Sequence, residues 1–260
     1  MALADGIDEH TLLCERCGYV LEGLETSGNC PECGKPIAES LPERRAGTLW
    51  QNEPSLKNLL KTAWMTLRRP GTTCDLMRIE QGGRVGLATM LIALAIAIYG
   101  VASTALAVAL TREFEGVYHI IIVGGFNAGI SGADVKLLPW LAAPLAPLLF
   151  LCTWIEARGL RLFGARRGYR VTRASSWTIC AHGCVGWLVA SLSISLGATL
   201  TILGFRLYID WPDWLTETLK YGGFLLALLG GLGGFLFFEW FAYIGLKRCR
   251  FANRARPVEA

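Results

Sequence analysis

Two pairs of cysteines near the N-terminus constrain the fold of this chain more than any other feature. They occur in Cys14-Glu-Arg-Cys17 and Cys30-Pro-Glu-Cys33, with twelve residues between the pairs. Two thiolates on one tight turn can reach the same ion, so the spacing predicts a tetrahedral metal site. Because all four ligands are cysteines, we expect a closed structural site for zinc, without an open catalytic position.

The segment 11–37 is therefore predicted to be a four-cysteine zinc ribbon. Gly18 and Gly34 follow the second cysteine of each pair, where a positive φ lets backbone amides point at sulfur. A head of this size buries too little apolar surface to fold alone, so the metal would supply most of its stability. Three alternatives remain open from the residues alone: a rubredoxin-like iron site, two disulfides, and four unrelated cysteines.

The charge of the head argues against nucleic acid as its partner. Residues 11–40 contain two basic and five acidic side chains, a net charge of −3. An acidic surface is a poor binder of phosphate backbones. We expect protein contact instead, through a small apolar surface formed by Tyr19, Leu21 and Leu24, unless these residues form the core of the ribbon itself.

The rest of the chain has the composition of a membrane protein. Its mean hydropathy is +0.41, and 53% of all residues are hydrophobic. Uncharged or nearly uncharged runs approach or exceed the roughly 20 residues that cross a bilayer as a helix. The sequence predicts an all-α integral membrane protein with a bundle over 85–246 and about four spans, at 85–110, 137–156, 176–205 and 221–246. A fifth stretch, 117–130, is short for a span and fits a buried or re-entrant segment.

The distribution of Lys and Arg predicts the orientation of these spans. The flank up to residue 84 carries ten, the loop 158–173 carries six, and the tail from residue 247 carries five. The two remaining loops carry two each. With four spans the basic segments fall on one side, which places both termini in the cytoplasm, the basic tail 247–260 included. The N-terminus shows no cleavable signal peptide.

A linker and one amphipathic helix are predicted to join the head to the bundle. Residues 38–53 are polar and without periodicity. Within 54–69, an apolar stripe with helical spacing lies beside basic residues, so we expect a helix at the membrane surface, or else packed on the head or the span ends. The stripe comprises Leu56, Leu59, Leu60, Ala63, Trp64 and Leu67, and the basic residues are Lys57, Lys61 and Arg68.

The predicted spans carry few ionisable side chains that could take part in catalysis or transport. Glu239 lies in the fourth span, where a carboxylate must face the bundle, pair or be protonated. Glu156 is predicted to mark the membrane interface, and His182, between Cys180 and Cys184, to be a packing residue. No catalytic set is visible, so we expect no enzyme. The alternative function is a small-solute or ion transporter, which would use Glu239 and the second span, broken by Pro139, Pro144 and Pro147.

Glycine is frequent in the fourth span. Gly230 and Gly234 form a small-xxx-small pair, which suits close helix packing within the chain or self-association into a homo-oligomer.

Two family resemblances complete the sequence-based picture. The run from Cys14 through Gly18-Tyr19-Val20-Leu21-Glu22-Gly23-Leu24 to Cys30-Pro31-Glu32-Cys33-Gly34 resembles the N-terminal zinc ribbon of planctomycete membrane proteins. The body is similar to YIP-type membrane proteins at Arg69-Pro70, at Leu160-Arg-Leu-Phe-Gly164, and from Tyr169 to Leu188. These resemblances imply a bacterial inner-membrane protein that organises membranes without catalysis. YIP-type bodies have five spans, one more than the four predicted here.

Overall fold

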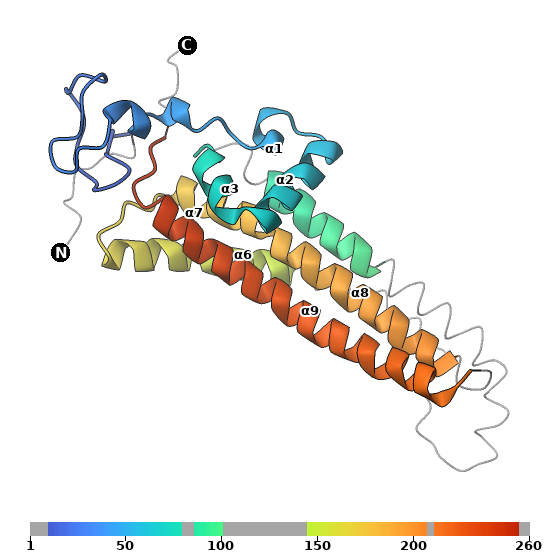
Figure 1. Cartoon of the computed structure of the whole chain (residues 1–260). Coiled ribbons are helices and arrows are strands. Elements are labelled where there is room, and N and C mark those ends of the chain that lie inside the picture. Colours follow the sequence, from blue (N-terminus) through green and yellow to red (C-terminus); the bar gives the residue numbers. More distant parts are fainter. Residues whose placement is uncertain (1–9, 80–85, 101–144, 207–210, 255–260) are drawn as a thin grey trace. The chain divides into compact units, whose positions relative to one another are not determined.

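The computed structural model describes residues 10–79, 86–100, 145–206 and 211–254 (Figure 1). Within these ranges the chain is mostly helical, and no strand is formed. The predicted segment 117–130, Pro139 and Pro144 lie outside the described residues. The chain divides into two compact units. The ribbon unit comprises Met1–Met90, Leu151–Val185 and Phe237–Ala260, and the hairpin unit comprises Leu91–Phe150 and Gly186–Leu236.

Two helices are long and apolar enough to cross a membrane, judged by length and composition. They are Arg173–Gly204 and Asp213–Arg248. Only 28% of the most apolar 18-residue stretch of the first helix is buried, and only 17% of that of the second. Such exposure is unlike the core helix of a soluble protein. They contain most of the third and all of the fourth predicted span. The first two spans are described only in part, as a helix at Gly86–Gly100 and as α6 (Leu145–Arg166), so four spans are not confirmed.

The helix boundaries differ from the sequence-based ones at three places. The third predicted span is divided into α7 (Arg173–Gly183) and α8 (Val185–Arg206), which meet at Cys184. Helix α9 (Asp213–Arg248) begins eight residues before the predicted span. Helix α6 continues to Arg166, so much of the predicted arginine-rich loop is helical. Pro147 lies in the first turn of α6 as described, where a missing amide proton breaks no helical hydrogen bond.

The segment predicted as a polar linker, 38–53, contains short helices. It forms η1 (Ile37–Ser40), η2 (Pro42–Arg44) and α1 (Leu49–Asn52). Thr48 caps α1 in a capping box with Gln51, which satisfies amide donors at the helix start. Ser40, Arg45 and Trp50 are buried. Polar composition alone therefore misrepresents this segment, because its polar groups are hydrogen-bonded inside the ribbon unit.

Helix α2 (Leu56–Arg68) occupies the range predicted to be amphipathic, but only part of its predicted apolar stripe is buried. It contacts α1, α3 (Pro70–Leu76) and α7 through Leu59, Thr62, Ala63 and Thr66. The other half of the predicted apolar stripe, Leu56, Leu60 and Trp64, stays more than half exposed. The Arg68 guanidinium lies 4.3 Å from the centre of the Trp64 ring. The helix is thus packed on the ribbon unit and still presents an apolar and basic face.

In the hairpin unit, α8 and α9 lie side by side as an antiparallel pair (Figure 1). Small residues fill the seam between them at intervals of three or four residues. A Cβ added at Gly197 would lie 2.4 Å from the carbonyl oxygen of Gly223, and one at Gly234 would lie 2.4 Å from that of Gly186. Gly230, from the predicted small-xxx-small pair, lies against Ser193. The pair therefore serves packing within one chain.

We predict that Gly197→Ala destabilises this helix pair by at least about 2 kcal/mol, since the new methyl group collides with backbone that cannot move aside. Gly222→Ala is the matched control, because a Cβ at Gly222 meets nothing within 4 Å. The control should be neutral or up to about 1 kcal/mol stabilising, as alanine favours helix more than glycine does. Denaturant unfolding in detergent micelles measures both. Equal stabilities of the two variants would contradict the close seam.

Candidate metal centre

The four N-terminal cysteines come together as predicted. The sulfur atoms of Cys14, Cys17, Cys30 and Cys33 all lie within 4.8 Å of one another. Cys14 Sγ is 3.5 Å from Cys33 Sγ, and Cys17 Sγ is 3.6 Å from Cys30 Sγ. Four sulfurs bound at about 2.3 Å around one tetrahedral ion would be about 3.8 Å apart. The cluster is therefore compatible with a single metal ion.

Two similar hairpins build this centre, and the second repeats the first sixteen residues later. In each, the glycine after the second cysteine donates to the carbonyl of the first, from Gly18 to Cys14 and from Gly34 to Cys30, at 2.9 Å. Both glycines have positive φ, 83° and 70°. The left-handed conformation closes each turn and is unfavourable for residues with a Cβ, which explains glycine at both positions.

Backbone amides at the first hairpin favour a thiolate. Burial raises the pKa of the Cys14 thiol, but backbone hydrogen bonds from Cys17 and Arg16 outweigh it and lower that pKa to about 7. Burial raises the pKa of Cys17 to about 12, and the neighbouring sulfur atoms add to this rise. A cation at the centre would stabilise all four thiolates together.

The remaining cysteines do not join this cluster, and none of the nine is in a disulfide. An S–S bond measures about 2.0 Å, far less than the separations in the cluster. Cys180 and Cys184 are buried in the α7 region, and among the described residues only the N-terminal group brings three or more metal-binding side chains together.

His182 is a buried packing residue, as the sequence suggests. Its Nδ1 lies 2.9 Å from the carbonyl oxygen of Thr178, which can only accept, so Nδ1 carries the proton. Nε2 then accepts from the Thr48 hydroxyl at 3.3 Å. The histidine therefore links α7 to the cap of α1. Of the two carboxylates noted in the predicted spans, Glu156 lies on α6 and Glu239 on α9.

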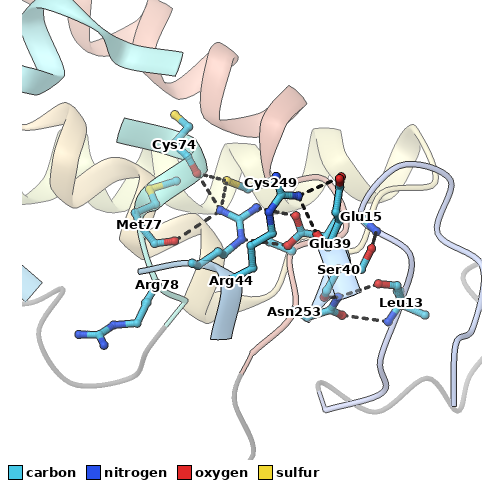
Figure 2. A network of polar contacts seen from close by, with 12 residues as sticks. Leu13, Glu15, Glu39, Ser40, Arg44, Cys74, Met77, Arg78, Cys249 and Asn253 are labelled. Atoms are coloured by element: carbon cyan, nitrogen blue, oxygen red, sulfur yellow. Dashed lines mark hydrogen bonds and ion pairs between the residues drawn. The ribbon is translucent and has the colours of Figure 1, made fainter. Parts of the chain in front are cut away.

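The ribbon is docked on the residues that follow α9, a contact that the sequence does not reveal. The side-chain amide of Asn253 accepts from the Leu13 amide at 2.9 Å and donates to the carbonyls of Leu13 and Ser40 at 2.6 and 2.7 Å (Figure 2). Arg170 donates to the Asn253 oxygen at 2.6 Å and to the carbonyl of Thr11. Asn253 is only 3% exposed, so these bonds form away from water.

An aromatic side chain from the same tail covers the first hairpin. Phe251 lies so close to Gly18 that an added Cβ would be 2.7 Å from its ring. The Tyr169 ring meets Phe251 edge-on with centroids 5.9 Å apart. Within the described part of the tail, Cys249, Ala252 and Asn253 are buried.

A buried arginine makes a second connection between the ribbon and its surroundings. The Arg45 guanidinium is paired with both oxygens of Glu15, at 2.9 and 3.1 Å. It also donates to the carbonyls of Cys74 and Met77, at the carboxyl end of α3. Although burial works against the charge, Cys249 and Glu15 raise the pKa of Arg45 above its ordinary value. The chain segment predicted as a linker thus supplies a structural ion pair.

Sequence reasoning missed Asn253, Arg170 and Arg45. Asn253 and Arg170 lie in basic segments that the positive-inside rule explains fully, and Arg45 lies in a polar stretch. Their partners are up to 240 residues away in the chain, so no spacing rule connects them. The one available signal was Phe251-Ala252-Asn253, an uncharged run within a basic tail.

Comparison of the chain with protein-family models, with curated proteins and with solved structures gave no match.

The two hairpin glycines provide a test of the docking. Gly18→Ala and Gly34→Ala both place a Cβ at positive φ, which costs roughly 1–2 kcal/mol in each case. Only at Gly18 does the new methyl group also collide with Phe251, since a Cβ at Gly34 meets nothing within 4 Å. We expect Gly18→Ala to lower the free energy of unfolding by at least about 1 kcal/mol more than Gly34→Ala. Thermal unfolding of the metal-loaded protein would measure this difference. Equal losses of stability in the two variants would mean that Phe251 does not contact Gly18.

Proposed function

We propose that this chain is a non-enzymatic integral protein of a bacterial inner membrane, whose zinc ribbon binds a protein partner at the cytoplasmic face. The apolar, largely exposed helices Arg173–Gly204 and Asp213–Arg248 support the membrane assignment. The excess of Lys and Arg in the N-terminal flank and the C-terminal tail supports cytoplasmic termini. Packing of the ribbon against the residues after α9 supports a location of both on the same side of the membrane.

Zinc is the metal that we propose for the four-cysteine centre. Four thiolates with closed tetrahedral spacing are typical of structural zinc, and a cytoplasmic ribbon keeps its thiols reduced. Iron would fit the same ligands. A site with iron bound by four cysteines absorbs visible light, whereas the same site with zinc does not.

A groove beside the ribbon is the observation that carries the partner-binding proposal. It has a volume of about 700 Å³, and its apolar lining includes Leu12, Leu24, Leu41 and Pro42. Leu24 is 39% exposed. Leu21, which the sequence places on the same predicted apolar surface, is only 1% exposed. The charged residues Glu22, Glu43 and Arg254 also line the groove, so carboxylates outnumber guanidinium groups there by one. Leucines flanked by charged side chains of slight acidic excess fit an extended partner segment that is mainly apolar and carries some basic side chains.

The metal assignment predicts the behaviour of the purified protein. We expect one zinc per chain by elemental analysis and no visible absorption, whereas four-cysteine iron would give a coloured protein. Cys30→Ser should lose the metal and the folded ribbon, while membrane insertion persists because the spans do not depend on the centre. A chain that fails to insert after this change would contradict that independence.

The partner assignment is tested by crosslinking in native membranes, with mass spectrometry of what co-purifies. We expect a partner that is captured by the wild type and lost from Leu24→Asp and from Cys30→Ser/Cys33→Ser. Tyr19→Asp is the matched control, because Tyr19 is similarly exposed, at 38%, and does not line the groove. If wild type and Leu24→Asp capture the same proteins, the ribbon is a stabilising cap and the groove has no partner.

A further inference from the structure

A second cavity of the ribbon unit has the opposite electrostatic character from the groove. It has a volume of about 630 Å³ and lies where the ribbon, α3 and the end of α9 meet. Both basic residues of the ribbon, Arg16 and Lys35, contribute to its lining, and so do Lys247 and Arg250 from the opposite end of the chain. Docking of the ribbon on the tail therefore brings basic residues from both ends of the sequence to one cavity.

Three carboxylates also line this cavity, but each is already neutralised by an arginine of the same lining. The N–O distances of these three ion pairs range from 2.5 to 3.1 Å. The pairs are Arg45 with Glu15, Arg44 with Glu39, and Arg248 with Asp75. The acidic residues thus cancel three arginines and leave the other cations of the lining uncompensated.

Four cations remain, and within the described part of the chain none of them pairs with a carboxylate. Arg16 reaches only a carbonyl, that of Cys33 at 3.5 Å. Lys247 lies over the Tyr243 ring at 4.4 Å, and Arg250 lies near aromatic rings and donates to the carbonyl of Arg16. Lys35 is half-buried. The carboxyl end of α9 adds a partial negative charge of about one half, which four cations exceed.

We propose that this cavity binds a phosphate-bearing ligand with two or more negative charges. Guanidinium forks and lysine ammonium groups are the side chains that recognise phosphate oxygens. The volume is in the range of small-molecule sites. Lys247 is one residue from the end of α9, which is long enough to span a membrane. A lipid headgroup and a free phosphate ester both reach such a position. The proposal requires the docked ribbon but not the partner-binding groove.

The test uses the full-length protein in nanodiscs and two probes. In neutral phosphatidylcholine discs, inorganic pyrophosphate is titrated by calorimetry at fixed ionic strength. In discs with about one third phosphatidylglycerol, native mass spectrometry counts retained anionic lipids. Lys35→Gln/Lys247→Gln should weaken binding at least about tenfold, because two of four cations are lost. The control, Lys57→Gln/Lys61→Gln, removes two exposed lysines from α2, away from the cavity.

Pyrophosphate binding that is lost only in the cavity variant would identify a soluble phosphate compound. Retention of anionic lipid that is lost only in that variant, without pyrophosphate binding, would identify a headgroup. No binding of either probe, or equal weakening in the control, would overturn the proposal. Metal content and thermal stability report whether each variant is folded. Lys35→Arg keeps the charge and should bind like the wild type. Loss of binding in this variant, if it is folded, would overturn recognition by charge even where the glutamine variant does not fold.

Discussion

The side-chain amide of Asn253 is the contact on which the arrangement of the ribbon unit depends. Its oxygen accepts from the Leu13 amide and from Arg170, and its nitrogen donates to the carbonyls of Leu13 and Ser40. Because both the oxygen and the nitrogen of this buried amide are hydrogen-bonded, the ribbon has little freedom to change its orientation on the tail. Removing the amide would leave several buried polar groups without partners. Through this residue the ribbon becomes part of a larger unit with the end of α9.

Docking creates a basic cavity beside a ribbon whose own net charge is negative. Residues 11–40 carry a net charge of −3, which argues against a phosphate ligand as long as the head is considered by itself. In the folded unit the acidic residues Glu15 and Glu39 are held by arginines from the adjoining segment. Arg16 and Lys35 instead line the same cavity as Lys247 and Arg250. Net charge over a sequence segment therefore does not describe a surface to which distant segments contribute.

The parts that could be predicted from sequence are those determined by short-range spacing. The two residues between the cysteines of each pair predict the four-cysteine cluster, and helical periodicity predicts the position of α2. Long apolar runs locate the helices Arg173–Gly204 and Asp213–Arg248. The turn at Cys184 and the docking of Phe251 and Asn253 leave no such pattern, because they result from packing between segments far apart. The stripe on α2 shows the same limit: its period was visible, but which half is buried depends on α1, α3 and α7.

The geometry also indicates how a metal bound by the four cysteines would affect the end of α9. Arg16 lies between the two cysteines of the first hairpin, and Lys35 lies two residues after the last cysteine of the second. A metal ion that orders both hairpins thereby positions both cations. The same hairpins present the Gly18 face that Phe251 covers and the Leu13 backbone that Asn253 holds. The residues after α9 are thus bound to a surface whose shape the four cysteines determine. A metal bound at this centre would therefore be linked to the conformation at the end of α9.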